Sequence, residues 1–289
     1  MRIVNTISEL RADIAQTRAS GQTVGLVPTM GALHAGHLSL IEAASQRDDF
    51  VVVSIFVNPT QFGPEEDYQR YPRQLARDTK LAAQAGAHLI FAPQPAEMYS
   101  EDHSTWVEVE NLTEGLCGRF RPGHFRGVTT VVTKLLNIVQ PDRAYFGEKD
   151  YQQLVVIKRM VRDLNIPVEI VGLPTVREAD GLAVSSRNQY LDTQQRAAAP
   201  QLYQALQHGA AAARNGASGT EVERVVCDLL AKEPMFAVQY VQAVHPETLE
   251  PRSEAGVPMV IAVAAYLGNT RLIDNIKIEE DATNVKNDG

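Results

Sequence analysis

The chain has 289 residues, of which 44% are hydrophobic and 21% are charged, and its formal net charge at pH 7 is −8. This length allows two domains of about 150 residues each, and domains of that size bury sizeable cores without disulfide bonds. The negative charge argues against general binding to DNA, RNA or anionic membranes, so any nucleotide must be held by local charge.

Strand-like and helical segments alternate over the first half of the chain, after an amphipathic helical pattern at 1–16. The run 127–141 fits a helix or a strand, and its length and Pro141 favour a helix. In chain order we expect a strand at 23–29, a helix at 36–47, a strand at 50–57, a helix at 71–86, a strand at 87–93, a helix at 127–141, a strand at 143–147, a helix at 150–164 and a strand at 167–174. This order predicts an α/β fold, a Rossmann-like parallel sheet with right-handed crossovers and helices on both faces.

The second half has a different pattern. Helices are expected at 193–214 and 219–232, and strand-like runs at 236–245 and 257–276 with a hairpin turn at GNT. We therefore expect a boundary near 174–176. It divides the chain into a Rossmann-like domain, 1–175, and a smaller C-terminal α+β domain with antiparallel strands, 176–289. The polar tail after Glu280 is expected to fray.

Three features predict a cytoplasmic protein. The two cysteines, Cys117 and Cys227, are far apart and lack metal-site spacing, which is typical of a reducing compartment. The N-terminal pattern lacks the apolar core of a signal peptide. No apolar run reaches the ~18 residues that a membrane-spanning helix requires.

Residues 25–40, GLVPTMGALHAGHLSL, lead from the first expected strand into its helix. Ligands of open α/β sheets bind at such strand ends, where glycines let the backbone approach a ligand and the helix N-terminus favours an anion. His34 and His37 would share one face of a helical first turn and donate hydrogen bonds to phosphate oxygens. The alternatives are ordinary polar residues or a metal pair. Zinc ligands on a helix are more often four apart, and no third ligand is evident nearby in the sequence.

The pattern G-x-x-H-x-G-H after a first strand resembles the HIGH motif of the adenylyl-transferring superfamily. More specifically, the chain resembles the pantothenate synthetase (pantoate–β-alanine ligase) family, in the family's order and spacing. The matching stretches are VPTMGALHAGH (27–37), SIFVNPTQFGPEEDYQRYPR (54–73), RPGHFRGVTTVVTKLLNIVQPD (121–142), FGEKDYQQL (146–154) and VREADGLAVSSRNQYL (176–191). One departure is Val184, where the family pattern has methionine.

The resemblance implies an ATP-dependent ligase that joins pantoate to β-alanine through a pantoyl adenylate, giving pantothenate, AMP and pyrophosphate. It also implies Mg²⁺ to screen the phosphates, no nucleic-acid or membrane partner, and a homodimer. The apolar run 127–139 exceeds what one core face of a helix needs, which also favours a dimer formed by the first domain.

The resemblance further implies an ATP site built from four stretches. His37 would be the catalytic histidine with His34 as its helper, and Lys149 a movable cation for the phosphates. Lys149 stands at a helix start, where a cation is disfavoured unless an anion lies nearby. AVSSR (183–187) resembles the mobile phosphate-binding loop KMSKS. The implied ATP-binding residues are Met30, Gly31, Ala32, Leu33, His34, Ala35, Gly36, His37, Gly147, Glu148, Lys149, Asp150, Val176, Val184, Ser185, Ser186 and Arg187.

The acceptor site is implied to hold two uncharged amides, Gln61 for pantoate and β-alanine and Gln153 for pantoate. An amide suits a carboxylate that must stay nucleophilic, whereas a full salt bridge would weaken its attack. Adjacent helical residues point about 100° apart. Gln153 should therefore face the ligand, and Gln152 should face solvent or a neighbouring loop. Asn58 is expected to support the loop of Gln61.

Three points remain open on the sequence alone. Val128, Val131, Val132 and Leu135 fit either an apolar wall for pantoate or plain core packing. The cluster of Arg119, Arg121, His124 and Arg126 fits either attraction of anionic substrates or a solvated loop at a subunit contact. The protein ligands of Mg²⁺ are unknown, with Asp78 a weak candidate.

Rival functions share parts of these motifs. A nucleotidyltransferase that adenylylates a phosphate would keep His34 and His37 but would not need Gln61 and Gln153. A tRNA synthetase would need a basic anticodon-binding domain, which the sequence lacks. A non-catalytic nucleotide-binding module would not need His37, Lys149 and Arg187 together.

Overall fold

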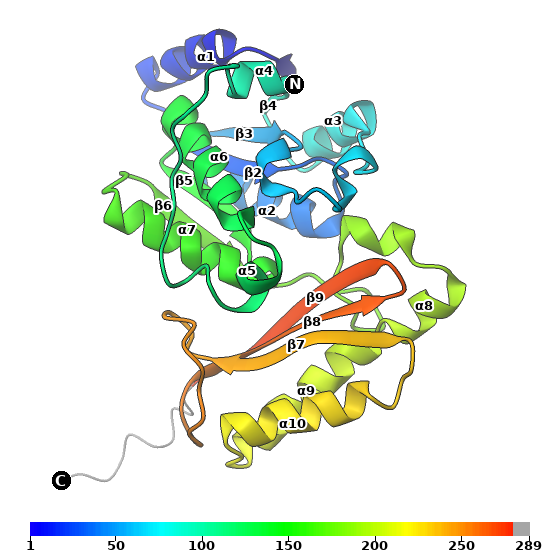
Figure 1. Cartoon of the computed structure of the whole chain (residues 1–289). Helices are drawn as coiled ribbons and strands as arrows, with labels where there is room; N and C mark the ends of the chain where they lie inside the picture. The colour runs from blue at the N-terminus through cyan, green and yellow to red at the C-terminus, as the bar shows by residue number, and fades with distance from the viewer. Residues whose placement is uncertain (280–289) are drawn as a thin grey trace, which may run out of the picture. The chain divides into compact units, whose positions relative to one another are not determined.

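A computed structural model describes residues 1–279, which fall into two compact units (Figure 1). The first comprises residues 1–176 and 184–186, and the second 177–183 and the described residues from 187 onward. Residues 184–186, from the loop that we assigned to the C-terminal domain, therefore cluster with the first unit. The expectation for the tail after Glu280 lies outside the described residues.

The first unit is built on a parallel sheet with strand order β1-β4-β3-β2-β5-β6. Its strands are β1 (Arg2–Val4), β2 (Val24–Thr29), β3 (Phe50–Ile55), β4 (Leu89–Phe91), β5 (Arg143–Gly147) and β6 (Glu169–Leu173). Its helices are α1 (Ile7–Ala19), α2 (Ala35–Arg47), α3 (Leu75–Gln84), α4 (Pro95–Met98), α5 (Leu116–Phe120), α6 (His124–Val139) and α7 (Tyr151–Asp163). Short 3-10 turns are η1 (Pro59–Gln61), η2 (Asp67–Gln69) and η3 (Glu148–Asp150).

Helices cover both faces of this sheet, as the sequence predicts (Figure 1). Alternate strand residues point to opposite faces. Leu26 and Val52 belong to the core shared with α1, α6 and α7, whereas Val27 and Val53 belong to the core shared with α2 and α3. The strands are buried on both sides, which explains their nearly continuous apolar sequences.

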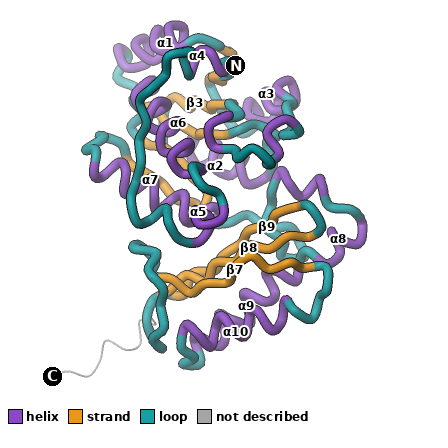
Figure 2. The backbone as a smooth tube through the Cα atoms, in the orientation of Figure 1, coloured by secondary structure: helices purple, strands orange, loops and turns teal. Residues whose placement is uncertain are grey.

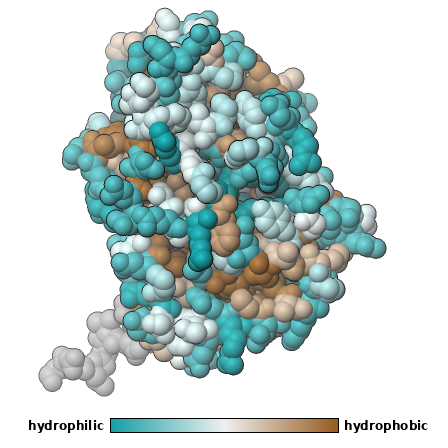
Figure 3. All heavy atoms as spheres, in the orientation of Figure 1, coloured by the Kyte–Doolittle hydropathy of each residue, from teal (hydrophilic) through white to brown (hydrophobic). Residues whose placement is uncertain are grey.

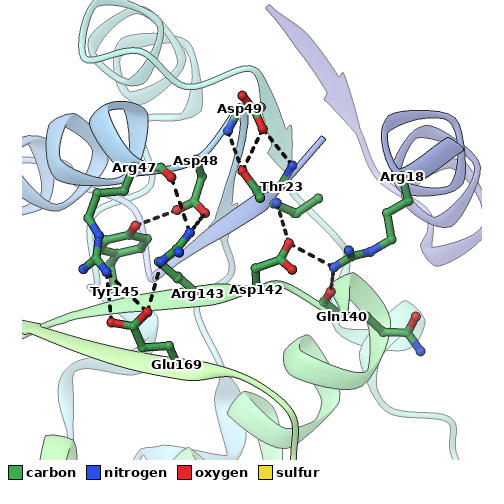
Figure 4. A network of polar contacts seen from close by, with 11 residues as sticks. Arg18, Thr23, Arg47, Asp48, Asp49, Gln140, Asp142, Arg143, Tyr145 and Glu169 are labelled. Carbon is green, nitrogen blue, oxygen red and sulfur yellow. Dashed lines mark hydrogen bonds and ion pairs between the residues drawn. The ribbon is translucent and has the colours of Figure 1, made fainter. Parts of the chain in front are cut away.

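A network of polar contacts lies at the amino-terminal ends of the sheet's strands (Figure 4). The buried Asp48 accepts hydrogen bonds from the Tyr145 hydroxyl at 2.5 Å and from Arg143 Nη1 at 2.8 Å. Glu169 pairs with Arg143 and Arg47 at the surface. Burial, together with the bond to Asp48, raises the pKa of Tyr145. The charged side chains at this end of the strands pair with one another, and the motif residues lie at the opposite end.

The second unit contains an antiparallel sheet in the order β7-β8-β9. Its strands are β7 (Phe236–Val244), β8 (Met259–Leu267) and β9 (Thr270–Ile278), and its helices are α8 (Thr193–Ala198), α9 (Gln201–Arg214) and α10 (Gly219–Leu230). The helices and one face of the sheet share a core that includes Leu206, Val226 and Ile261 (Figure 2). The turn between β8 and β9 falls in the predicted GNT, with Gly268 at φ +57°.

Three of the differences from the predicted element boundaries have a local cause. The N-terminal pattern contains the edge strand β1, because Thr6 caps α1 and delays its start to Ile7. The expected helix 71–86 begins only at Leu75, since Pro72 disfavours helix at Tyr71. Pro200 has no N–H to donate, and the helix predicted at 193–214 is accordingly split into α8 and α9.

The face drawn in Figure 3 is largely hydrophilic, with hydrophobic side chains gathered in smaller patches. Within residues 1–279, none of the helices combines the length and the apolar character needed to cross a bilayer.

Candidate active site

The loop between β2 and α2 has a backbone shape that glycine makes accessible. Gly31 lies at φ +79° and Ala32 at φ +51°, both in the left-handed region. A Cβ at position 31 would lie 3.1 Å from Asp78 Oδ2 and 3.1 Å from Ile55 Cγ2. Any larger residue would therefore meet both backbone strain and two close neighbours.

Asp78, in the first turn of α3, anchors this loop. Its carboxylate is completely buried and accepts hydrogen bonds from the backbone N–H groups of Ala32 and Leu33, each at 2.8 Å. Both oxygens are thus engaged with the loop. Among residues 1–279, no three His, Cys, Asp or Glu side chains are grouped as a metal site. Asp78 therefore shapes the loop, and the structure gives no support to it as a Mg²⁺ ligand.

The rings of the two histidines lie against each other, tilted by 32°, at the start of α2, where His34 is the N-cap residue. Their ring centroids are 4.0 Å apart, and the His34 backbone N–H donates to His37 Nδ1 at 3.4 Å. Since Nδ1 of His37 accepts, a neutral ring carries its proton on Nε2. His34 Nδ1 is buried and has no hydrogen-bond partner within residues 1–279. A buried polar atom without a partner is costly, so this nitrogen indicates a place where a ligand supplies one.

Both histidines are held in the neutral form. Burial, followed by the positive charges of Lys149 and Arg77, lowers the pKa of His34 to about 4. Burial, followed by electrostatic repulsion from His34 and Lys149 on adding a proton, holds the pKa of His37 well below its usual value. A neutral imidazole can donate a hydrogen bond to a phosphate oxygen without being a fixed cation.

Residues of the other predicted ATP stretches lie around this loop in the first unit. Lys149, in the turn η3 after β5, is close enough to lower both histidine pKa values, and its Nζ lies 3.8 Å from Asp150 Oδ2. Ser186 Oγ donates to the carbonyl of Ala32 at 3.2 Å. The Val184 N–H donates to the carbonyl of Val176 at 3.0 Å. Arg187 belongs to the second unit.

Gln61 directly contacts the loop between β2 and α2. Its Nε2 lies 3.1 Å from Met30 Sδ, and its Oε1 accepts from Asn58 Nδ2 at 3.1 Å. Asn58 is buried and also accepts from the Tyr99 hydroxyl at 2.9 Å. The structure thus confirms that Asn58 supports the Gln61 loop, and it brings one predicted acceptor residue against one predicted ATP residue.

The two glutamines of α7 diverge as the helix phase predicts. Gln152 is buried, and its Oε1 accepts from the Cys117 N–H at 2.9 Å. Its Nε2 donates to the carbonyls of Leu112 at 2.9 Å and Gly115 at 3.0 Å. Gln152 therefore faces a neighbouring loop, which is one of the two directions expected for it. Gln153 is partly exposed on a different side of the helix.

The valines and the leucine of α6 are core residues. Val128, Val131, Val132 and Leu135 are all between 2% and 6% exposed and belong to the core beneath the sheet. This outcome favours core packing over an apolar wall. The apolar run of α6 is also buried within the unit, so it no longer argues for a dimer.

The basic cluster is divided between buried and exposed residues. Arg121 pairs with Glu66, and His124 is buried, which argues against a solvated loop at these two positions. Arg126 is exposed and lies over the Trp106 ring at 4.5 Å from its centroid, and Arg119 is exposed.

A family model described as pantoate-beta-alanine ligase matches residues 2–277. The chain belongs to the pantoate–β-alanine ligase family. It is 55% identical over 280 residues to the pantothenate synthetase of Moorella thermoacetica, covering 96% of this chain and 99% of that protein. It is 52% identical over 283 residues to the pantothenate synthetase of a Pseudomonas aeruginosa strain, covering 97% of this chain and 100% of that protein.

Solved structures of the family have the same fold. A pantothenate synthetase from Thermus thermophilus is 52% identical, with a TM-score of 0.92 over 96% of this chain and 100% of that chain. A pantoate-beta-alanine ligase from Francisella tularensis, described as complexed with beta-gamma ATP and beta-alanine, is 36% identical, with a TM-score of 0.81 over 96% of this chain and 97% of that chain. The family and the fold class predicted from the motifs are thereby confirmed.

Sequence reasoning named Asp78, Arg121 and His124 but missed their contacts. Asp78 anchors the loop after β2, and Arg121 and His124 contact the backbone of Gln61. Asp78 had a signal, since it shares one face of its helix with Leu81 and Ala82. A charge on an apolar face needs an internal partner. Arg121 and His124 gave no comparable signal, because clustered basic residues usually face solvent.

Proposed function

We propose that the chain is an ATP-dependent ligase that condenses pantoate with β-alanine to give pantothenate, AMP and pyrophosphate. The observation that carries the proposal is the neutral His34–His37 pair at the start of α2, with Gln61 in contact with the same loop through Met30. The pair offers N–H donors for phosphoryl oxygens, and the amide offers an uncharged group for the acceptor. Family membership supplies the substrate class.

In the first step, a carboxylate oxygen of pantoate attacks the α-phosphorus of ATP, and pyrophosphate leaves. His37 and His34 donate hydrogen bonds to phosphate oxygens as negative charge redistributes in the transition state. Lys149 adds a positive charge for the same oxygens, and the N-terminus of α2 points partial positive charge at them. Neither histidine acts as a nucleophile.

In the second step, the unprotonated amine of β-alanine attacks the acyl carbon of the adenylate, the bond from that carbon to the AMP oxygen breaks, and the proton of the amine passes to solvent as AMP leaves. Gln61 and Gln153 hold pantoate, and Gln61 also contacts β-alanine. Both are uncharged, so they bind the pantoate carboxylate without the full salt bridge that would reduce its nucleophilicity.

The proposed reaction also requires Mg²⁺, which would bind together with ATP. Asp78 is occupied by Ala32 and Leu33, and the described residues offer no group of three acidic, histidine or cysteine ligands. The phosphates and water would therefore hold the ion, whose charge screens the phosphates. A homodimer and a cytoplasmic location remain predictions. The dimer now rests on the family resemblance alone.

Isotope exchange tests this function. Labelled pyrophosphate should be incorporated into ATP only when pantoate and Mg²⁺ are both present, and β-alanine should not be required. Exchange that depends on a phosphate ester and not on pantoate would support the rival nucleotidyltransferase. No exchange with any acceptor, despite ATP binding, would support a non-catalytic nucleotide-binding module.

Gln153→Ala should weaken use of pantoate by about 10- to 100-fold with little change in the KM for ATP. It leaves polar groups of the substrate unpaired in a closed pocket, at a cost of about 1–3 kcal/mol. Steady-state kinetics with each substrate varied in turn provides the measurement.

Gln152→Ala is the matched control on the adjacent residue. It loses hydrogen bonds to the loop of Leu112, Gly115 and Cys117, so it should lower the melting temperature more than it changes the KM for pantoate. If Gln152→Ala had the larger effect on pantoate, or if Gln153→Ala impaired only ATP use, the assignment would be wrong.

A further inference from the structure

A chain of polar side chains, one buried and two partly buried, ends on the backbone of Gln61. The carbonyl oxygen of Gln61 lies 2.8 Å from His124 Nδ1 and 3.4 Å from Arg121 Nη2. Glu66, five positions after Gln61, completes the chain by pairing with the same guanidinium group. All of these residues belong to the first unit.

The partners of His124 fix its tautomer. A carbonyl oxygen only accepts hydrogen bonds, so Nδ1 of His124 must donate to Gln61. Arginine only donates, so Nε2, which lies 3.0 Å from Arg121 Nη1, must accept. His124 is therefore neutral, with its proton on Nδ1. Burial, followed by the charge of Arg121, lowers the pKa of His124 to about 3, in agreement with this assignment.

The guanidinium group of Arg121 is fully engaged. Its Nε donates to Glu66 Oε1 at 2.6 Å and its Nη2 to Glu66 Oε2 at 2.7 Å, a two-pronged ion pair. The remaining N–H groups on Nη1 and Nη2 point to His124, the Cys117 sulfur and the Gln61 carbonyl. The Arg121 side chain is only 14% exposed. Binding a substrate carboxylate would require the bonds to Glu66 to break first.

The segment held by this chain is also packed closely on α6. A Cβ at Gly127 would lie 2.4 Å from the carbonyl oxygen of Thr60, so the two backbones touch. Asn58 Nδ2 donates to the Gly127 carbonyl at 3.1 Å. The turn η1 therefore rests on α6 from one side, while Arg121 and Glu66 close the loop that follows it.

We propose that Glu66, Arg121 and His124 are positioning residues, which hold the backbone of Gln61 and thereby aim its side-chain amide at the acceptor substrates. This inference rests on the proposed function and extends it by three residues that touch no substrate. Direct binding of a substrate carboxylate by Arg121 is the alternative, and the two roles predict opposite effects when Glu66 is changed.

Glu66→Gln removes the charge that holds Arg121 and keeps the size of the side chain. If Glu66 is a positioning residue, this substitution should raise the KM for pantoate or β-alanine on the order of 10-fold. The KM for ATP should change less than about 2-fold. Arg121→Lys should do the same, because an ammonium group cannot bridge Glu66, His124 and Gln61 together. If Arg121 binds substrate, Glu66→Gln frees it, and the acceptor KM should stay constant or fall.

Two variants of His124 give a second comparison. Asparagine can place an amide N–H near the position of Nδ1, so His124→Asn should retain most of the acceptor affinity. His124→Leu fills a similar volume without a donor, so it should raise the acceptor KM on the order of 10-fold. Equal effects of the two variants, at equal melting temperatures, would overturn the role of His124.

A double-mutant cycle tests whether the chain acts through Gln61. If it does, Glu66→Gln should add little to the defect of Gln61→Ala, whereas independent sites would give additive effects. Glu169→Gln is the matched control, since it breaks ion pairs with Arg143 and Arg47 at the opposite edge of the same sheet (Figure 4). It should leave every KM unchanged.

These outcomes separate the inference from the function on which it rests. If the unsubstituted enzyme lacks pantoate-dependent exchange of pyrophosphate, the proposed function fails. If that enzyme is active while Glu66→Gln and Arg121→Lys fold normally with unchanged acceptor KM values, only the positioning role fails. Additive effects in the cycle would also overturn it.

Discussion

His37→Ala should slow formation of the adenylate by ~10²–10³-fold, which corresponds to the loss of about 3–4 kcal/mol of transition-state stabilisation. His37 is neutral, its Nδ1 accepts from the His34 backbone, and its Nε2 is left to donate. A donor fixed by the fold needs no reorganisation when charge develops on the phosphoryl group. Removing it should affect the rate of the first step more than the affinity for ATP.

Single-turnover measurement of adenylate formation, with pantoate in excess and the enzyme in excess over ATP, checks this expectation. His37→Gln is the matched variant, since a glutamine amide can place an N–H near the position of Nε2 and should restore part of the rate. Thermal melting should show that all three proteins fold. Nearly unchanged single-turnover rates in His37→Ala, with normal melting, would remove His37 from the catalytic step.

Asp78→Asn should reduce both stability and adenylate formation. An asparagine oxygen can accept from one of the two N–H groups of Ala32 and Leu33, but its amide nitrogen then faces the other N–H. Leaving a buried donor unpaired costs about 1–3 kcal/mol. The loop leads to His34 and His37, which we propose to contact the phosphates, and a shift of about 1 Å in such a group can cost 10²-fold in rate.

Urea unfolding and pyrophosphate exchange together measure this effect. Asp163→Asn is the control, because Asp163 pairs with Arg162 at the surface, where both side chains are more than half exposed. It should change neither stability nor rate appreciably. Raising the Mg²⁺ concentration should not rescue Asp78→Asn. Recovery of activity with added Mg²⁺, at unchanged stability, would instead make Asp78 a metal ligand.

The loop between β2 and α2 illustrates what local sequence could establish. The strand before it and the helix after it follow from neighbouring residues. The expectation that both histidines lie in the helical first turn holds only for His37, because His34 is the N-cap residue and has an extended backbone. The choice between strand and helix for α6 was settled by its length and by Pro141. Two errors in the predicted helices also have local causes, because Thr6 delays the start of α1 and Pro200 separates α8 from α9.

Contacts between residues far apart in the chain could not be predicted from local sequence. Asp78 reaches Leu33 across 45 positions, Arg121 reaches Glu66 across 55, and His124 reaches Gln61 across 63. Composition shows that an acid or a base is present, but not which partner it will face. Gln152 illustrates the same limit. The helix period predicted which way its side chain points, but only the structure showed that it accepts a hydrogen bond from the Cys117 N–H.

The sequence by itself determined the α/β class, the family and the stretches that build the site, because these depend on periodicity, turn residues and motif spacing along the chain. The tertiary structure alone decided which polar side chains are available for ligand and which are consumed within the protein. The physical reason is burial: an ionised group removed from water must find partners, and the packing of α3, α5 and α6 provides them. The sequence left Asp78 as a weak candidate for a metal ligand and Arg121 in a basic cluster with two open interpretations. The structure shows Asp78 bound to the backbone N–H groups of Ala32 and Leu33, and Arg121 paired with Glu66.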